Sequence, residues 1–148
     1  MALIAAAIAA SIAYRQWKTA AAAVTTAKSK LKLDLFERRF NVFQAASRLI
    51  VRMAQDTAHD DKAVAALLGE TAGAEFLFDE KVNSYLVGEL YVRTGNIMRR
   101  QYEMLTAQTS DAKLFNKLAD EQMTELEWFE GQLDVWKDLT RPFLELTH

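Results

Sequence analysis

The chain has 148 residues, of which 51% are hydrophobic and 26% are charged, and its formal net charge is −2. This is the length of one domain, and the apolar fraction excludes intrinsic disorder. Five glycines and one proline are too few for the turns of an all-β fold. The absence of cysteine excludes disulfides, thiolate metal sites and cysteine nucleophiles. The composition therefore predicts an all-α protein.

The small net charge hides a strong asymmetry along the chain. Residues 15–52 carry nine Lys and Arg against two acidic residues, whereas residues 53–148 carry nine basic against eighteen acidic residues. The acidic part is typical of a solvated surface. The basic part directly follows an apolar N-terminus, which favours contact with an anionic membrane surface.

Residues 2–14, ALIAAAIAASIAY, are uncharged and would span roughly 20 Å as a helix, less than the roughly 30 Å core of a bilayer. A short signal anchor, a packed core helix and a signal peptide are the three interpretations. The positive charges follow the apolar run, which disfavours a signal peptide. Trp17 is placed as an interfacial aromatic residue and Lys18 as a snorkelling cation. We expect a membrane anchor that comprises Ala2, Leu3, Ile4, Ile8, Ile12, Tyr14 and Trp17.

The orientation of this anchor follows from the cations behind it. The juxtamembrane basic residues are Arg15, Lys18, Lys28, Lys30 and Lys32. The positive-inside rule then places the N-terminus outside and the remainder in the cytoplasm. The expected organisation is a membrane anchor and juxtamembrane helix at 1–27 and a cytoplasmic helical bundle at 28–148.

Residues 28–43, KSKLKLDLFERRFNVF, alternate like a strand at first and then recur with a helical period. The run from 19 to 54 contains no turn signal and is far longer than a strand, so we predict one helix with two adjacent apolar stripes. Such a wide face is expected to contact two neighbours. The candidate interface is the stripe with Leu31, Leu35, Val42 and Leu49.

Arg39 lies between the two apolar stripes of this helix. Either it snorkels to the edge, or its guanidinium is buried between helices and held by a carboxylate, because an unpaired buried charge is too unfavourable. We expect the buried ion pair.

Three further helices follow. Asp60 or Asp61 can cap a short helix over 62–74, and Asp79 can cap a long helix that continues to about 105. A last helix begins after Ser110 or Asp111, and Pro142 is expected to end it. The predicted fold is an N-terminal membrane helix that continues into an antiparallel bundle of three long helices plus one short helix.

No chemical motif is present. The sequence lacks a glycine-rich phosphate loop, a GxSxG elbow and HExxH. Glu145-x-x-His148 and Asp56-x-x-His59 are the only hints of a metal site, and a di-iron bundle needs paired motifs with two more glutamates. We therefore predict no catalytic residues, no metal and no cofactor. Nucleic acid is not expected as a partner, because the aromatic residues follow the packing stripe rather than the exposed arginines.

The stretch at 30–40, KLKLDLFERRF, together with FLF at 76–78, WF at 128–129 and RPFL at 141–144, resembles a set of small uncharacterised bacterial membrane proteins. These have one N-terminal transmembrane segment, then a helical domain with a K-L-x-L-D-L-F-x-x-R-[FY] stretch. The resemblance implies a bacterial inner-membrane protein and brings no activity.

We expect a non-enzymatic accessory or interaction subunit that holds a partner at the inner membrane. Its expected partners are membrane lipids and either further copies of itself or a larger membrane protein complex. A membrane-acting defence or stress effector and an enzyme with an unrecognised site are the alternative hypotheses.

Overall fold

The structure is a computed structural model that describes residues 2–55, 61–109 and 111–145. These residues are helical or lie in turns and caps, so the all-α prediction is confirmed. The elements are α1 (Ala2–Ala54), α2 (Asp61–Glu70), a 3₁₀ turn η1 (Ala74–Phe76), α3 (Glu80–Ser84), a π-helical segment η2 (Tyr85–Tyr91), α4 (Val92–Ala107), α5 (Ala112–Phe129) and α6 (Gln132–Leu144). Since α3, η2 and α4 follow one another without a break, they form one long helix. The described residues therefore form five helices.

Residues 28–43 lie within α1, so the helical interpretation of that stretch is confirmed. By its contacts the chain divides into two compact units, Met1–Glu37 and Arg38–His148. The division falls inside α1. The first unit is helical wherever it is described, and the second contains the bundle.

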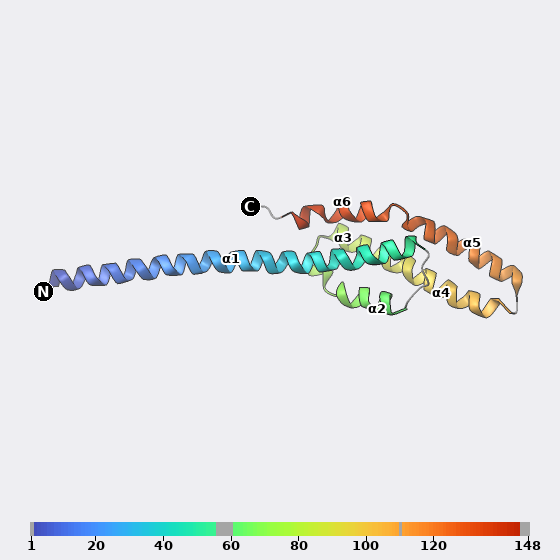
Figure 1. The fold of residues 1–148 in the computed structure, drawn as a ribbon, viewed down its shortest axis with the longest axis horizontal. Coiled ribbons are helices and arrows are strands. Elements are labelled where there is room, and N and C mark those ends of the chain that lie inside the picture. The colour runs from blue at the N-terminus through green and yellow to red at the C-terminus, as the bar shows by residue number, and fades with distance from the viewer. Residues whose placement is uncertain (1, 56–60, 110, 146–148) are drawn as a thin grey trace. The chain divides into compact units, whose positions relative to one another are not determined.

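Within the second unit, the helices alternate in direction from α1 to α5, and α6 continues in the direction of α5 (Figure 1). The C-terminal part of α1 is followed by α2 in the reverse direction, then α3–η2–α4 runs forward again and α5 returns alongside α4 (Figure 1). Short connections of this kind place consecutive helices beside one another.

The core lies between the C-terminal part of α1 and the helices that follow it. The buried residues of α1 recur at three and four residues and so share one face: Val42, Ala45, Ala46, Leu49, Ile50 and Met53. They pack in one cluster with residues of α2, α3–η2–α4, α5 and α6. Trp136 on α6 is fully buried; its ring stacks on Phe43 and its Nε1 donates to the Phe43 carbonyl at 3.1 Å. This contact joins α1, the first helix of the bundle, to α6, the last described helix.

The long middle helix owes its regular buried face to the π-helical segment. Four of its buried residues step by four, from Val82 to Leu86, Leu90 and Thr94, and each is 1% exposed or less. A step of four overshoots an α-helical turn of 3.6 residues by roughly 40°. Because a π turn is wider, η2 offsets this drift and keeps the four residues on one side. The predicted long helix from Asp79 to about residue 105 is confirmed, and it continues through Gly88 and Gly95.

The predicted last helix is two helices, so the count of three long helices plus one short helix is wrong. Gly131 adopts φ 79° and ψ −11°, a left-handed conformation that ends α5 and starts α6. Glycine reaches this region without the steric penalty of a Cβ. Pro142 was expected to end the helix but lies inside α6, which continues to Leu144. Pro142 has no amide hydrogen to donate to the carbonyl of Asp138, so α6 lacks that hydrogen bond and ends two residues later.

The expected membrane helix is also wrong. Among the described residues, no helix contains a stretch that is long and apolar enough to cross a membrane. The uncharged run at 2–14 is too short, and extending it brings in Arg15 and Lys18. Its many alanines add little hydrophobicity. The predicted single-pass anchor at the bacterial inner membrane is therefore wrong. The orientation inferred from that anchor is wrong with it.

Candidate functional site

The N-terminal half of α1 carries a continuous exposed surface with large apolar side chains. Every residue from 12 to 35 is exposed, and we call this range the exposed segment. Of the predicted anchor residues, Ile12, Tyr14 and Trp17 lie here, while the side chains of Ala2, Leu3, Ile4 and Ile8 lie outside those that are described. The five predicted juxtamembrane cations, Arg15, Lys18, Lys28, Lys30 and Lys32, are exposed as well.

The predicted interface stripe divides into two parts. Leu31 and Leu35 belong to the exposed segment, with exposed fractions of 69% and 36%. Val42 and Leu49 are 2% and 3% exposed and belong to the hydrophobic core. The bundle itself covers the second pair, so these two residues are not available to a partner and their assignment as interface candidates is corrected.

Arg39 is half-buried, and among the described residues its guanidinium pairs with backbone carbonyls rather than with the predicted carboxylate. Its Nε donates to the Leu77 carbonyl at 2.8 Å and its Nη1 to the Phe143 carbonyl at 3.4 Å. The guanidinium carbon also lies 5.4 Å from the centre of the Phe143 ring. Backbone carbonyls and a ring face satisfy the cation without a formal negative charge. Among the described residues, Arg39 thus links α1 to the segment before α3 and to the end of α6.

A shallow groove runs beside α1 and α2. One part has a volume of about 340 Å³ and is lined by residues that include Arg38, Asn41 and Gly73, with the strongly exposed Phe76 at its edge. A smaller part of about 120 Å³ contains the exposed ion pair between Arg48 and Glu70. Neither part places a nucleophile beside a base, so the groove has the character of a binding surface rather than of a catalytic pocket.

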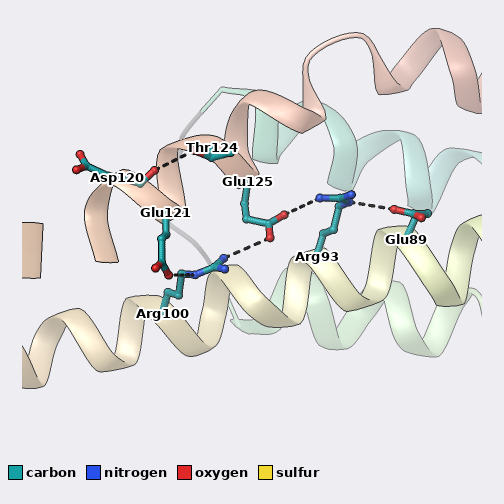
Figure 2. A network of polar contacts seen from close by, with 7 residues as sticks. All are labelled: Glu89, Arg93, Arg100, Asp120, Glu121, Thr124 and Glu125. Carbon is teal, nitrogen blue, oxygen red and sulfur yellow. Dashed lines mark hydrogen bonds and ion pairs between the residues drawn. The ribbon is translucent and has the colours of Figure 1, made fainter. Parts of the chain in front are cut away.

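The densest polar cluster joins η2 and α4 to α5 (Figure 2). Arg93 donates from Nε to Glu89 at 3.0 Å and from Nη1 to Glu125 at 2.9 Å. Arg100 donates from Nε to Glu121 at 3.3 Å, and its Nη1 lies 3.5 Å from the other carboxylate oxygen of Glu125. Glu125 therefore bridges two guanidinium groups. We call these five residues the Arg–Glu network.

The Arg–Glu network is partly buried between the helices that it joins. The side chains of Arg100 and Glu125 are only 14% and 15% exposed, and the Arg93 guanidinium carbon lies 4.3 Å from the centre of the Trp128 ring. Burial lowers the pKa of Arg93, but the hydrogen bonds to Glu89 and Glu125 and the negative charges of these two carboxylates together raise the pKa above its ordinary value. Each charge has an opposite partner, which is the arrangement of a packing contact between helices. The signal in the sequence was the Glu89–Arg93 spacing of four with Arg100 a further seven residues on.

Tyr85, at the start of η2, is a buried tyrosine enclosed by aromatic rings. Its ring stacks on Trp136 and Trp128, and its hydroxyl donates to Gln132 Oε1 at 3.1 Å. Burial, followed by the negative charge of Glu89, raises the pKa of Tyr85 to about 12. A tyrosine held so firmly in its neutral form serves as a packing residue.

Three of the four residues in the two possible metal-binding motifs lie outside the described part of the structure. These three are Asp56, His59 and His148. Within the described part of the chain, no three His, Cys, Asp or Glu side chains gather closely enough to hold a metal ion.

No family model, no curated protein and no solved structure matches this chain. The resemblance to small bacterial inner-membrane proteins is therefore wrong, since no family match supports it and the described helices include no membrane span.

Proposed function

We propose that this protein is a non-enzymatic interaction subunit in which the exposed segment of α1 binds another protein chain. One observation carries this proposal. Residues 12–35 form a helix whose side chains are all exposed, although they include Tyr14, Trp17 and Leu31. A contiguous apolar surface of this kind on a folded protein marks an interaction site. Recognition of one helix by another is a common way to cover such a face.

The arrangement of the polar residues supports binding over catalysis. Glu125 is engaged by Arg93 and Arg100, so its charge is committed to holding η2 and α4 against α5. A general base needs a substrate within reach and a pKa matched to its task. The polar side chains that line the larger part of the shallow groove are Arg38, Asn41 and Glu70, and they place no nucleophile beside a base.

The test is site-specific photo-cross-linking of the full-length protein in its native cells. A photoreactive amino acid at Val24 or Leu31 should give covalent adducts with a protein, because both positions lie on the exposed apolar surface. The matched control position is Asp120, an exposed residue of α5. Mass spectrometry of the adducts identifies what covers the segment. If neither Val24 nor Leu31 gives adducts above the level at Asp120, the proposed function is wrong.

A further inference from the structure

Most large apolar residues of the exposed segment follow a seven-residue repeat, and Ile12 and Leu33 lie off it. Two series alternate at steps of three and four: one consists of Tyr14, Ala21, Lys28 and Leu35, and the other of Trp17, Val24 and Leu31. These correspond to the a and d positions of a coiled coil, and six of the seven are apolar. We call this line of seven residues the seam.

The seam is open in the structure. Trp17 and Leu31, two of its largest members, are 67% and 69% exposed. All residues from 12 to 35 are exposed, so the seam is exposed along its whole length. A helix that repeats a and d positions over this length is built to pack against a second helix with the same repeat.

We infer that the seam pairs with the seam of a second copy of this chain, in the antiparallel direction. This inference rests on the proposed function and names its partner. The position of Lys28 carries the choice of direction. In a parallel pair, each a residue faces its own equivalent, which would place two Lys28 ammonium groups together in the core. In an antiparallel pair, an a residue faces a d residue, so the two lysines are separated.

The register follows from the charges and the aromatic residue. One alignment places Lys28 against Trp17 of the second copy, where the ammonium group can lie over the indole face. The same alignment places Tyr14 against Leu31 and Ala21 against Val24. All these positions lie within the exposed segment, and the pair is symmetric about the centre between residues 22 and 23.

The positions that flank the seam agree with this register. On one side they are Ala13, Ala20 and Ala27, which let the two helices approach closely. On the other side, Lys18 faces Thr25 of the second copy. A shift by one heptad in either direction would instead place Lys18 against another Lys18 or against Lys32. The chosen register is therefore the one in which these flanking lysines do not oppose each other.

The test uses two full-length variants, Tyr14→Cys and Leu31→Cys, in a chain that has no other cysteine. Oxidation of a mixture should give a disulfide-linked dimer that contains one copy of each variant. Either variant alone should give none, because the two copies of one position lie roughly 25 Å apart in the antiparallel pair. A parallel pair would instead give disulfide-linked dimers within each single variant. A protein that is strictly monomeric in sedimentation equilibrium would give no disulfide-linked dimer in any sample. Both of those results would overturn the inference.

A second pair of variants separates the seam from the rest of the helix surface. Leu31→Asp places a charge in the seam and should raise the dimer dissociation constant by on the order of a hundredfold. Leu33→Asp makes the same change at a position that is 50% exposed and lies away from the seam, and it should leave the constant within about threefold. Equal changes of the dissociation constant in the two variants would contradict pairing through the seam.

These results are distinguishable from failure of the proposed function. If the purified protein is monomeric while Val24 and Leu31 cross-link to a different protein in cells, the inference falls and the proposed function stands. If no protein cross-links at either position, the proposed function falls.

Discussion

At the scale of single residues, Glu125 is the clearest case of a side chain whose role depends on its neighbours. The carboxylate lies between Arg93 and Arg100 and is mostly shielded from solvent. In water such a pair contributes little, but removal of one member from a shielded pair leaves the other charges uncompensated. The identity of the neighbours, rather than the residue type, makes Glu125 a stabilising residue.

We predict that Glu125→Gln lowers the free energy of unfolding by about 2–4 kcal/mol, because two guanidinium groups lose their shared counter-charge. Chemical denaturation followed by circular dichroism measures this change. The matched control is Glu103→Gln on α4, whose partner Arg99 has a side chain that is 60% exposed. That variant should change the free energy of unfolding by less than about 0.5 kcal/mol. Equal losses in the two variants would contradict a special role for the Arg–Glu network.

Tyr85 provides a prediction on pH. Its folded pKa of about 12 lies above the ordinary value of 10.0, so the folded state keeps its proton in a range where the unfolded chain releases it. The stability contributed by this group is therefore fully present below pH 10 and is lost as the pH rises from about 10 to about 12. The loss amounts to about 2–3 kcal/mol.

Absorbance titration of the phenolate should detect this residue as a late step, and the step should be absent from Tyr85→Phe. The variant should also lose the hydrogen bond to Gln132, about 1 kcal/mol at neutral pH, and its stability should fall less steeply above pH 10. A titration in which Tyr85→Phe removes no late step would show that Tyr85 ionises at its ordinary pKa.

At the scale of elements, helix ends and breaks follow local chemistry. Asp79 accepts from the Val82 amide at 3.0 Å, and Asp111 accepts from the amides of Lys113 and Leu114. Both caps could be predicted because a carboxylate that satisfies free amides acts within one turn of sequence. The break at Gly131 has an equally local cause, a residue in the left-handed conformation.

Replacing each of two glycines by alanine should therefore change the free energy of unfolding in opposite directions. Gly131→Ala should lower the free energy of unfolding by about 1 kcal/mol, because alanine at φ 79° is strained. Gly95→Ala should raise it by about 0.5–1 kcal/mol, because Gly95 is exposed inside α4 and its added Cβ would meet no atom within 4 Å. Thermal unfolding followed by circular dichroism compares the two. A stabilising Gly131→Ala would indicate that α5 and α6 can straighten into one helix.

At the scale of the whole molecule, the bundle is held by contacts between residues far apart in sequence. Trp136 is the centre of this arrangement, since its ring stacks on Phe43 of α1 and Tyr85 of η2. It is fully buried, and its indole N–H is satisfied by a backbone carbonyl. A large residue in such a position contributes both apolar burial and a specific hydrogen bond.

We predict that Trp136→Ala lowers the free energy of unfolding by about 3–5 kcal/mol through loss of packing and the cavity that remains. Trp136→Phe should lose less, because it keeps most of the ring packing and leaves one carbonyl without its donor. The comparison uses denaturant unfolding of the full chain. The exposed Trp17 supplies the control, since Trp17→Ala should leave the unfolding of the bundle nearly unchanged. A small change of the free energy of unfolding in Trp136→Ala would show that Trp136 is not central to the hydrophobic core.

The sequence by itself determined the helical class and most helix positions. Helix periodicity, capping aspartates and the scarcity of glycine and proline act over a few residues, and these signals are present in any stretch read in isolation. The helix over 28–54, the start of α3 at Asp79 and the start of α5 at Asp111 could be predicted for this reason.

Only the tertiary structure decided which apolar residues are covered. Leu31, Leu35, Val42 and Leu49 lie on one stripe of one helix, yet the first two are exposed and the last two are buried. Their local sequence patterns are alike. Arg39 likewise finds its partners at Leu77 and Phe143, 38 and 104 residues along the chain. Burial and pairing depend on contacts between distant segments, and those contacts form only when the whole bundle packs.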